Sequence, residues 1–241
     1  MPKYQIADTV FDAKVKYPYT LNLCSDYLYL GDKTAEFSVE ITDEDIKREK
    51  EISEKYETLP TFPDPYLESL ALFRKLNDYI LTNKNGVVFH SSAISLDGDG
   101  YLFIGKSGAG KSTHARLYKE YFLDRVTVIN DDKPIIKKTD DGFMVYGTPF
   151  CGKHKIGENT SAKIKGVCEI VQSKVTKVEV LSKTQAVAVL LNQVVRQSDR
   201  KKAEKLLDLI EDLARSVKVI RLYCDISHSA VKTGLDAFNK E

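Results

Sequence analysis

The sequence GKSGAGKST at residues 105–113 constrains the fold of this chain more than any other stretch. Its first eight residues match the pattern G-x-x-x-x-G-K-[ST], in which a glycine-rich loop holds phosphate between a buried strand and a helix. The flanking segments YLFI and STHARLYKEYF supply that strand and that helix. We therefore predict an α/β domain with a P-loop core. The loop consists of Gly105, Lys106, Ser107, Gly108, Ala109, Gly110, Lys111 and Ser112.

The residue types of this loop predict how it holds a nucleotide. Glycines let successive backbone N–H groups turn toward an anion, and the helix N-terminus adds a partial positive charge. Lys111 is expected to contact the β- and γ-phosphates, and the Ser112 hydroxyl is expected to ligate Mg²⁺. Thr113 follows directly and is assigned to the same nucleotide site. The predicted ligands are ATP and Mg²⁺, with Mn²⁺ as an alternative ion.

A pair of acidic residues ends the next apolar strand pattern, VTVINDD at residues 126–132. Asp131 lies 20 residues after Lys111, which leaves room for one helix and a return strand. Asp131 and Asp132 are therefore expected at the carboxyl end of a strand beside the loop, where ligands bind in α/β sheets. We assign both, with Ser112, to metal binding, and Asp131 also to proton transfer from a hydroxyl nucleophile.

His90 is a third candidate, in the strand pattern VVFHSSAISL at residues 87–96. This pattern precedes a predicted hairpin turn at residues 97–100, which leads into the phosphate loop. A neighbouring strand could therefore point the His90 imidazole at the γ-phosphate or at a second metal ion.

The segment GTPFCGKHKIGEN at residues 147–159 places Cys151, Lys153 and His154 between glycines on a predicted loop, a common location for functional residues. Lys153 is a catalytic candidate because its ammonium could neutralise charge on a phosphoryl group during transfer. His154 could orient an acceptor, and Arg196 is a weaker candidate for the electrostatic role. A glycine-rich surface turn is the alternative interpretation of this segment.

The rest of the chain predicts a mixed β-sheet flanked by helices at residues 63–241, preceded by a small β-rich N-terminal region at residues 1–62. A helix is expected at about residues 65–83, because apolar residues recur at helical spacing behind Asp64-Pro65. The charged run 42–57 predicts a solvated helix or loop. Further strands, a hairpin around Asp141-Gly142 and three later helices complete the predicted α/β domain.

Charge and cysteine usage exclude several classes of function. A formal net charge of +1 gives no electrostatic basis for binding nucleic acid or an anionic membrane. The four cysteines are widely spaced and form no C-x-x-C pair, which disfavours a zinc cluster or a disulfide framework. No signal-peptide pattern and no apolar run approaching a membrane span are seen. We expect a soluble, cytoplasmic protein.

Together, FHSSAISLDGDGYLFIGKSGAGKST and VINDDKP resemble the core shared by HPr kinase/phosphorylase and ATP-dependent phosphoenolpyruvate carboxykinase. The whole chain is also similar to bacterial HPr kinase-like serine kinases, which share NDDKP, GTPFCGKH and RLYCDISHSAV. The resemblance implies a P-loop sheet of the HPr kinase/carboxykinase type. It implies Lys111 on the phosphates, Ser112 on Mg²⁺, His90 and Asp132 near the metal or γ-phosphate, and Asp131 as the acid/base.

Two departures narrow what the resemblance implies. The arginine-glycine signature of the phosphorolytic reaction is not found, and the N-terminal region is too short and too charged to be a carboxykinase substrate domain. The expected activity is transfer of the γ-phosphoryl group of ATP to a serine-like hydroxyl of a peptide, protein or small molecule. A nucleotide-binding regulatory or scaffold module with weak ATPase activity is the alternative. Related kinases often form oligomers, which makes a homo-oligomer possible, but the oligomeric state cannot be read from the sequence.

Overall fold

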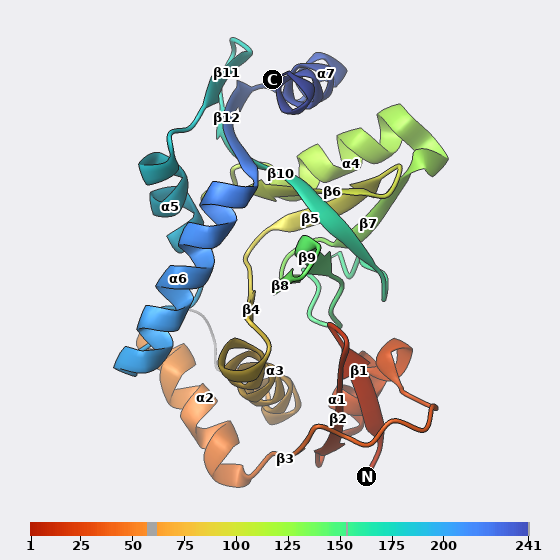
Figure 1. Ribbon diagram of the computed structural model, residues 1–241. Coiled ribbons are helices and arrows are strands. Elements are labelled where there is room, and N and C mark those ends of the chain that lie inside the picture. The colour runs from red at the N-terminus through yellow and green to blue at the C-terminus, as the bar shows by residue number, and fades with distance from the viewer. Residues whose placement is uncertain (57–61, 153, 241) are drawn as a thin grey trace. The chain divides into compact units, whose positions relative to one another are not determined.

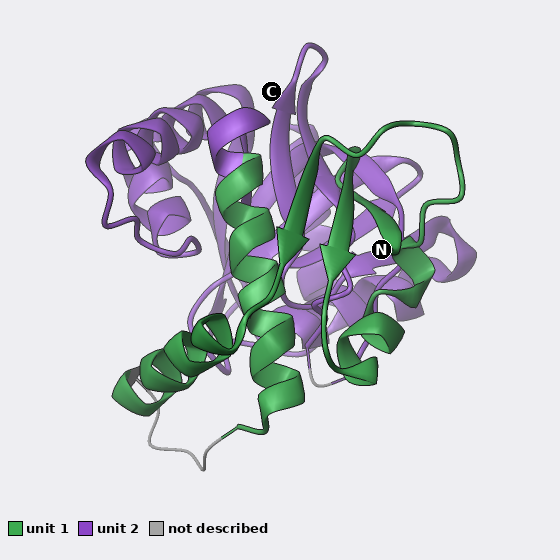
Figure 2. Cartoon of the chain, turned by 90° about the horizontal axis from the view of Figure 1, so that it is seen from below, with its two compact units in different colours: residues 1–80 green, residues 81–241 purple. Residues whose placement is uncertain are grey.

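The computed structural model describes residues 1–56, 62–152 and 154–240, which form two compact units, Met1–Ile80 and Leu81–Glu241 (Figure 2). The predicted boundary between residues 62 and 63 lies before helix α3 (Asp64–Asn83), whereas most of α3 belongs to the first unit. Lys75 of α3 pairs with Asp45 of helix α2 (Asp43–Tyr56) at 2.6 Å, one of the contacts that tie α3 to the N-terminal region.

The first unit contains a three-stranded sheet in the order β1 (Lys3–Ile6), β2 (Thr9–Lys14) and β3 (Phe37–Glu40). Positive φ angles of 49° at Ala7 and 57° at Asp8 form the tight turn between β1 and β2. Apolar and polar residues alternate in YLYLGDKTAEFSVEI at residues 27–41, which predicts strand structure, but only Phe37–Glu40 of this segment forms a strand, β3. Helix α1 (Pro18–Leu23) and a 3-10 turn, η1 (Ser25–Tyr27), lie between β2 and β3.

Helix α3 confirms the helix predicted at residues 65–83. Its apolar stripe is buried, as the fully covered side chains of Leu67, Leu76 and Ile80 show. The helix is followed by Asn85, whose φ of 50° lies in the left-handed region common after helix ends. The charged run before it forms α2, which confirms the predicted solvated helix.

The second unit is built on one mixed sheet in the order β4, β8, β9, β10, β6, β5 and β7, and β12 pairs with β10 and with β11 (Figure 1). The strand bounds are β4 Gly86–Val88, β5 Ser92–Leu96, β6 Asp99–Ile104, β7 Val126–Asn130, β8 Ile135–Thr139, β9 Gly142–Tyr146, β10 Ser161–Gln172, β11 Lys177–Val180 and β12 Lys218–Cys224. The predicted mixed α/β class is confirmed.

Helices cover both faces of this sheet. Helices α4 (Lys111–Phe122) and α7 (His228–Asn239) pack against one face, and α5 (Lys183–Leu191) and α6 (Arg200–Ser216) pack against the other. A short turn, η2 (Leu123–Arg125), follows α4. Strand β6 alternates between the two layers, since Phe103 joins the α4 and α7 side while Leu102 and Ile104 join the α5 and α6 side.

The single strand pattern at residues 87–96 is corrected by the structure, which forms two strands there. Strand β4 pairs with β8, whereas β5 pairs with β6 and β7 in another part of the sheet. Between them, Phe89 N–H donates to Pro134 O at 2.9 Å and Ser91 N–H donates to Asp132 O at 3.1 Å. These bonds lead the chain along the turn after β7, so His90 lies in a connection and not on a strand.

Candidate functional site

Three chain segments meet at one edge of the sheet in the second unit. Strand β5 is antiparallel to both β6 and β7, so its amino end lies between their carboxyl ends. Strand β6 leads into the glycine loop, β7 leads into Asp131, and the connection holding His90 leads into β5. The sheet topology thereby gathers the three motifs that the sequence separates by up to 42 residues, from His90 to Asp132.

The backbone of the loop requires its glycines. Gly108 and Gly110 have φ angles of 77° and 102°, which side-chain-bearing residues rarely adopt. A Cβ atom at either position would meet nothing within 4 Å, so the space over the loop is open. At Gly105 a Cβ would instead lie 2.9 Å from the Ile170 carbonyl oxygen of β10, which explains why that position has to be glycine.

Lys111 begins α4 and is largely buried. Its ammonium donates to the carbonyl of Gly105 at 3.1 Å and to that of Lys106 at 3.4 Å, so it lies over the loop. Burial lowers the pKa of Lys111, and the charge of Asp132 acts in the opposite direction. A cation in this position can balance the negative charge of phosphates held by the loop.

Ser112 lies at the contact between α4 and the end of β7. Its hydroxyl donates to the backbone carbonyl of Asp131 at 3.3 Å, and the buried Ser92 hydroxyl donates to the same carbonyl at 3.0 Å. The Ser92 and Ser112 hydroxyl oxygens lie 3.2 Å apart. A second serine, which no sequence pattern singled out, thus holds the predicted metal-binding hydroxyl against the acidic turn.

The two acidic side chains have different surroundings. Asp131 is buried, and its carboxylate accepts a hydrogen bond from the backbone N–H of Gly152 at 2.6 Å. Asp132 is more open, with one oxygen 3.4 Å from His90 Nε2 and the other 3.4 Å from Lys133 Nζ. The structure therefore brings His90 and Asp132 together and turns Asp131 toward Gly152.

His90 is half exposed, and its pKa is lowered chiefly by burial. The negative charge of Asp132 raises this pKa, while the positive charges of Lys111 and Lys133 lower it further. These effects favour a neutral imidazole near neutral pH. A neutral ring beside a carboxylate can donate or accept a hydrogen bond without adding charge to the site.

Asn130 connects the acidic turn to the following loop, although the sequence did not single it out. Its side-chain oxygen accepts from the N–H groups of Asp132 at 2.8 Å and Lys133 at 2.7 Å. Its amide donates to the carbonyl of Thr148 at 3.0 Å and approaches the Cys151 thiol at 3.5 Å. Since Asn130 is fully buried, these bonds fix the turn that carries both carboxylates.

The remaining candidates of the sequence analysis are Cys151, Lys153, His154 and Arg196. Lys153 lies outside the described residues. His154 and Arg196 are exposed. Burial, together with the charges of Asp131 and Asp132, raises the pKa of Cys151 to about 11, which keeps the thiol protonated and unsuited to act as a nucleophile.

The donor atoms at this edge fit a hard divalent cation. The Ser112 hydroxyl and the Asp131 and Asp132 carboxylates offer oxygen ligands, which Mg²⁺ prefers. Within residues 1–56, 62–152 and 154–240, no three His, Cys, Asp or Glu side chains form a group that could hold a metal ion by themselves. The oxygen atoms of Ser112, Asp131 and Asp132 therefore suit an ion that also takes ligands from phosphate and water, as Mg²⁺ commonly does.

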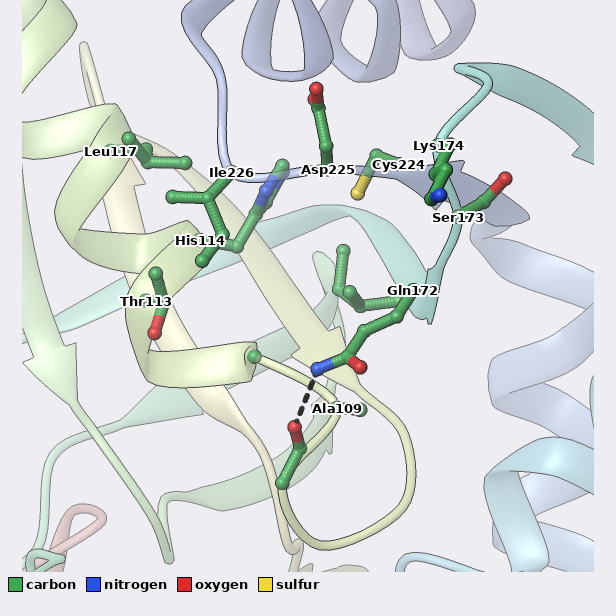
Figure 3. Close-up of a pocket in the computed structure, with 13 residues that line it drawn as sticks. Ala109, Thr113, His114, Leu117, Gln172, Ser173, Lys174, Cys224, Asp225 and Ile226 are labelled. Carbon is green, nitrogen blue, oxygen red and sulfur yellow. Dashed lines mark hydrogen bonds between the residues drawn. The ribbon is translucent and has the colours of Figure 1, made fainter.

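A cavity of about 630 Å³ adjoins the other side of the loop. It lies between the first turns of α4, the end of β10 and the end of β12 (Figure 3). Its described lining residues are Gly108, Ala109, Gly110, Thr113, His114, Leu117, Ile170, Gln172, Ser173, Lys174, Cys224, Asp225 and Ile226.

No protein-family model and no curated protein sequence matches this chain. Among solved structures, the fold is similar to that of the Hpr(Ser) kinase/phosphatase from Coxiella burnetii, with a TM-score of 0.34 and 9% sequence identity. The match covers 64% of this chain and 99% of that chain. A likeness this distant assigns no function to this chain.

None of the helices in the described chain is both long enough and apolar enough to span a bilayer.

Proposed function

We propose that this protein is a P-loop phosphotransferase that moves the γ-phosphoryl group of ATP to a hydroxyl group. The observation that carries the proposal is the meeting of the glycine loop, the Asp131-Asp132 turn and His90 at one sheet edge. A glycine loop alone suits any phosphate ligand. A buried carboxylate, a partly exposed carboxylate and an imidazole beside it add groups that can serve phosphoryl transfer to a hydroxyl.

On the donor side, the residues of the loop hold the phosphates. Backbone N–H groups of residues 105–113 surround them, and Lys111 balances the charge that builds on the β–γ bridging oxygen as its bond to phosphorus breaks. Ser112 and Asp132, with Asp131 nearby, would hold Mg²⁺, which neutralises phosphate charge when bound. His90 orients Asp132 through the 3.4 Å contact between them.

On the acceptor side, Asp131 takes the proton of the attacking hydroxyl. The acceptor oxygen forms the new bond to the γ-phosphorus, the bond to the β–γ bridging oxygen breaks, and ADP leaves. The Gly152 N–H, which donates to the Asp131 carboxylate, holds that base in one orientation. A serine side chain of a peptide or protein, or a small alcohol, supplies the same acceptor chemistry.

The test is incubation of the protein with γ-labelled ATP and Mg²⁺ in the presence of a cell lysate or a metabolite extract, followed by mass spectrometry of labelled products. Asp131→Asn is expected to reduce transfer at least about 100-fold while ATP affinity is kept. Asp141→Asn is the matched control, because Asp141 lies exposed on the turn between β8 and β9.

Two results would contradict this proposal. Undiminished transfer by Asp131→Asn would exclude Asp131 as the base. ATP-dependent binding of a partner without any phosphorylated product would instead favour the nucleotide-binding regulatory module.

A further inference from the structure

The cavity beside the glycine loop has the size and composition of a ligand site that the phosphate chemistry does not use. Its volume of about 630 Å³ falls within the range typical of pockets for small molecules. Leu117, Ile170 and Ile226 provide an apolar wall, and Gln172 and Asp225 provide polar groups (Figure 3). An apolar wall with a few polar groups is suited to a flat, partly polar ring system.

His114 provides the most specific indication of a ligand. Its side chain lines the cavity and the residue is only 3% exposed, yet Nε2 has no hydrogen-bond partner among the described residues. The ring is fixed by Phe103 and Tyr118, with centroids 4.9 Å and 5.4 Å away. Neighbouring atoms cover Nε2 in this structure, so a bound molecule would reach it only after a small shift of the cavity lining. Because an unpaired buried polar atom is costly, a molecule that supplies its partner in this way would be favoured here.

The glycine loop presents different residues to its two sides. Ser112 contacts the end of β7, and the charge of Asp132 raises the pKa of Lys111 against the lowering effect of burial. Neither Ser112 nor Lys111 is among the residues that line the cavity. Gly108, Gly110 and Thr113 line the cavity instead. A chain of phosphates bound along the loop would therefore have its terminal phosphate at the acidic turn and its other end at the cavity.

We propose that this cavity binds the nucleoside part, base and ribose, of the nucleoside triphosphate, and that His114 Nε2 exchanges a hydrogen bond with it. This inference rests on the proposed function, since it takes the triphosphate to lie in the loop. The acceptor does not suit the cavity, because an attacking hydroxyl has to reach the γ-phosphorus on the side of Asp131 and His90.

Gln172 couples the cavity to the loop. Its side-chain amide donates to the Gly108 carbonyl at 2.9 Å, so the end of β10 fixes the loop at the point where phosphates and nucleoside would join (Figure 3). Ile226 also lines the cavity and is 75% exposed, so a molecule that fills the cavity would cover part of its apolar side chain.

The test compares the binding of ATP and GTP with that of inorganic tripolyphosphate, each with Mg²⁺, by calorimetry. The wild-type protein is expected to bind one of the nucleotides at least about tenfold more tightly than tripolyphosphate, since only the nucleotide fills the cavity. His114→Phe keeps an aromatic ring but removes Nε2, and it is expected to weaken that nucleotide about tenfold without changing tripolyphosphate binding. His228→Phe is the matched control, because His228 is exposed on α7 and does not line the cavity.

A second variant, at an exposed position, tests the same assignment in case His114→Phe disturbs folding. Ile226→Ala removes an exposed apolar side chain and is expected to weaken the nucleotide several-fold, again without affecting tripolyphosphate. Val175→Ala, at a 71% exposed position outside the cavity lining, is its control. Equal affinities of wild type for nucleotide and tripolyphosphate, or unchanged nucleotide affinity in both variants, would overturn the assignment of the cavity. Absence of binding by all three ligands would instead overturn the proposed function.

Discussion

The backbone N–H of Gly152 donates a 2.6 Å hydrogen bond to the carboxylate of Asp131, across 21 residues of sequence. A Cβ atom on Gly152 would lie 3.2 Å from the second oxygen of that carboxylate and 3.3 Å from the Asp132 Cβ. These contacts are tighter than most Cβ contacts, so a side chain here would require the carboxylate or the loop to shift by a few tenths of an ångström. The orientation of Asp131 depends on a backbone group from a distant loop.

Gly152→Ala is expected to lower the rate of phosphoryl transfer about 10- to 100-fold, because the added methyl group displaces the Asp131 carboxylate. Transfer from ATP under saturating conditions checks this, with ATP affinity measured in parallel and expected to change little. Cys151→Ser is the control. It changes one side-chain atom of the neighbouring residue, and the wild-type Cys151 thiol is protonated. Equal losses in both variants would mean that the loop as a whole, and not the approach of Gly152, sets the rate.

Asn130→Ala is expected to lower the free energy of unfolding by about 3 kcal/mol, because it removes the buried amide and leaves the partly buried N–H groups of Asp132 and Lys133 without this acceptor. Urea denaturation measures the change. Asn192→Ala makes the same substitution at an exposed position and is expected to cost less than about 1 kcal/mol. A similar small cost at Asn130 would show that the acidic turn does not depend on its side chain.

Stability at acidic pH is expected to depend on His114. Burial lowers the pKa of His114 from 6.5 to about 4, so the unfolded chain binds a proton in this range that the folded chain does not. The free energy of unfolding therefore falls as pH decreases from 6.5 to about 4, by an amount on the order of 3 kcal/mol from this group.

Denaturation of wild type and of His114→Phe across pH 4–7 tests this dependence. The variant is expected to lose that part of the pH dependence, whereas His228→Phe is expected to keep it. Identical pH profiles for all three proteins would contradict a buried, neutral His114.

Glu68→Ala is expected to destabilise the first unit by about 3 kcal/mol. The buried Glu68 carboxylate accepts from the Tyr17 N–H at 3.1 Å and the Thr20 hydroxyl at 2.7 Å, and from the Lys16 N–H. Removing it leaves these donors unpaired at the start of α1. Thermal unfolding gives the change, and Glu51→Ala on the exposed face of α2 should leave the melting temperature within about 1 °C. A loss at Glu51 as large as that at Glu68 would contradict this role.

Local sequence patterns predicted much of the second unit correctly. The apolar strand before the glycine loop, the helix after it and the hairpin at residues 139–142 follow from periodicity and turn chemistry, which act between near neighbours. The break at His90 could not be read in this way. Residues 87–96 are apolar enough for one strand, and the bonds of Phe89 and Ser91 to the 132–134 turn decide otherwise.

The sequence by itself determined the glycine-rich turn between β6 and α4 and the acidic end of β7, because turn chemistry and strand periodicity act between near neighbours. Only the tertiary structure decided which groups meet there. Ser92 reaches Ser112, and Gly152 reaches Asp131. His114 lies buried beside the cavity, and its Nε2 has no hydrogen-bond partner in the described part of the chain. These relationships depend on strand order and on how loops distant in sequence pack together, and no local pattern encodes either one.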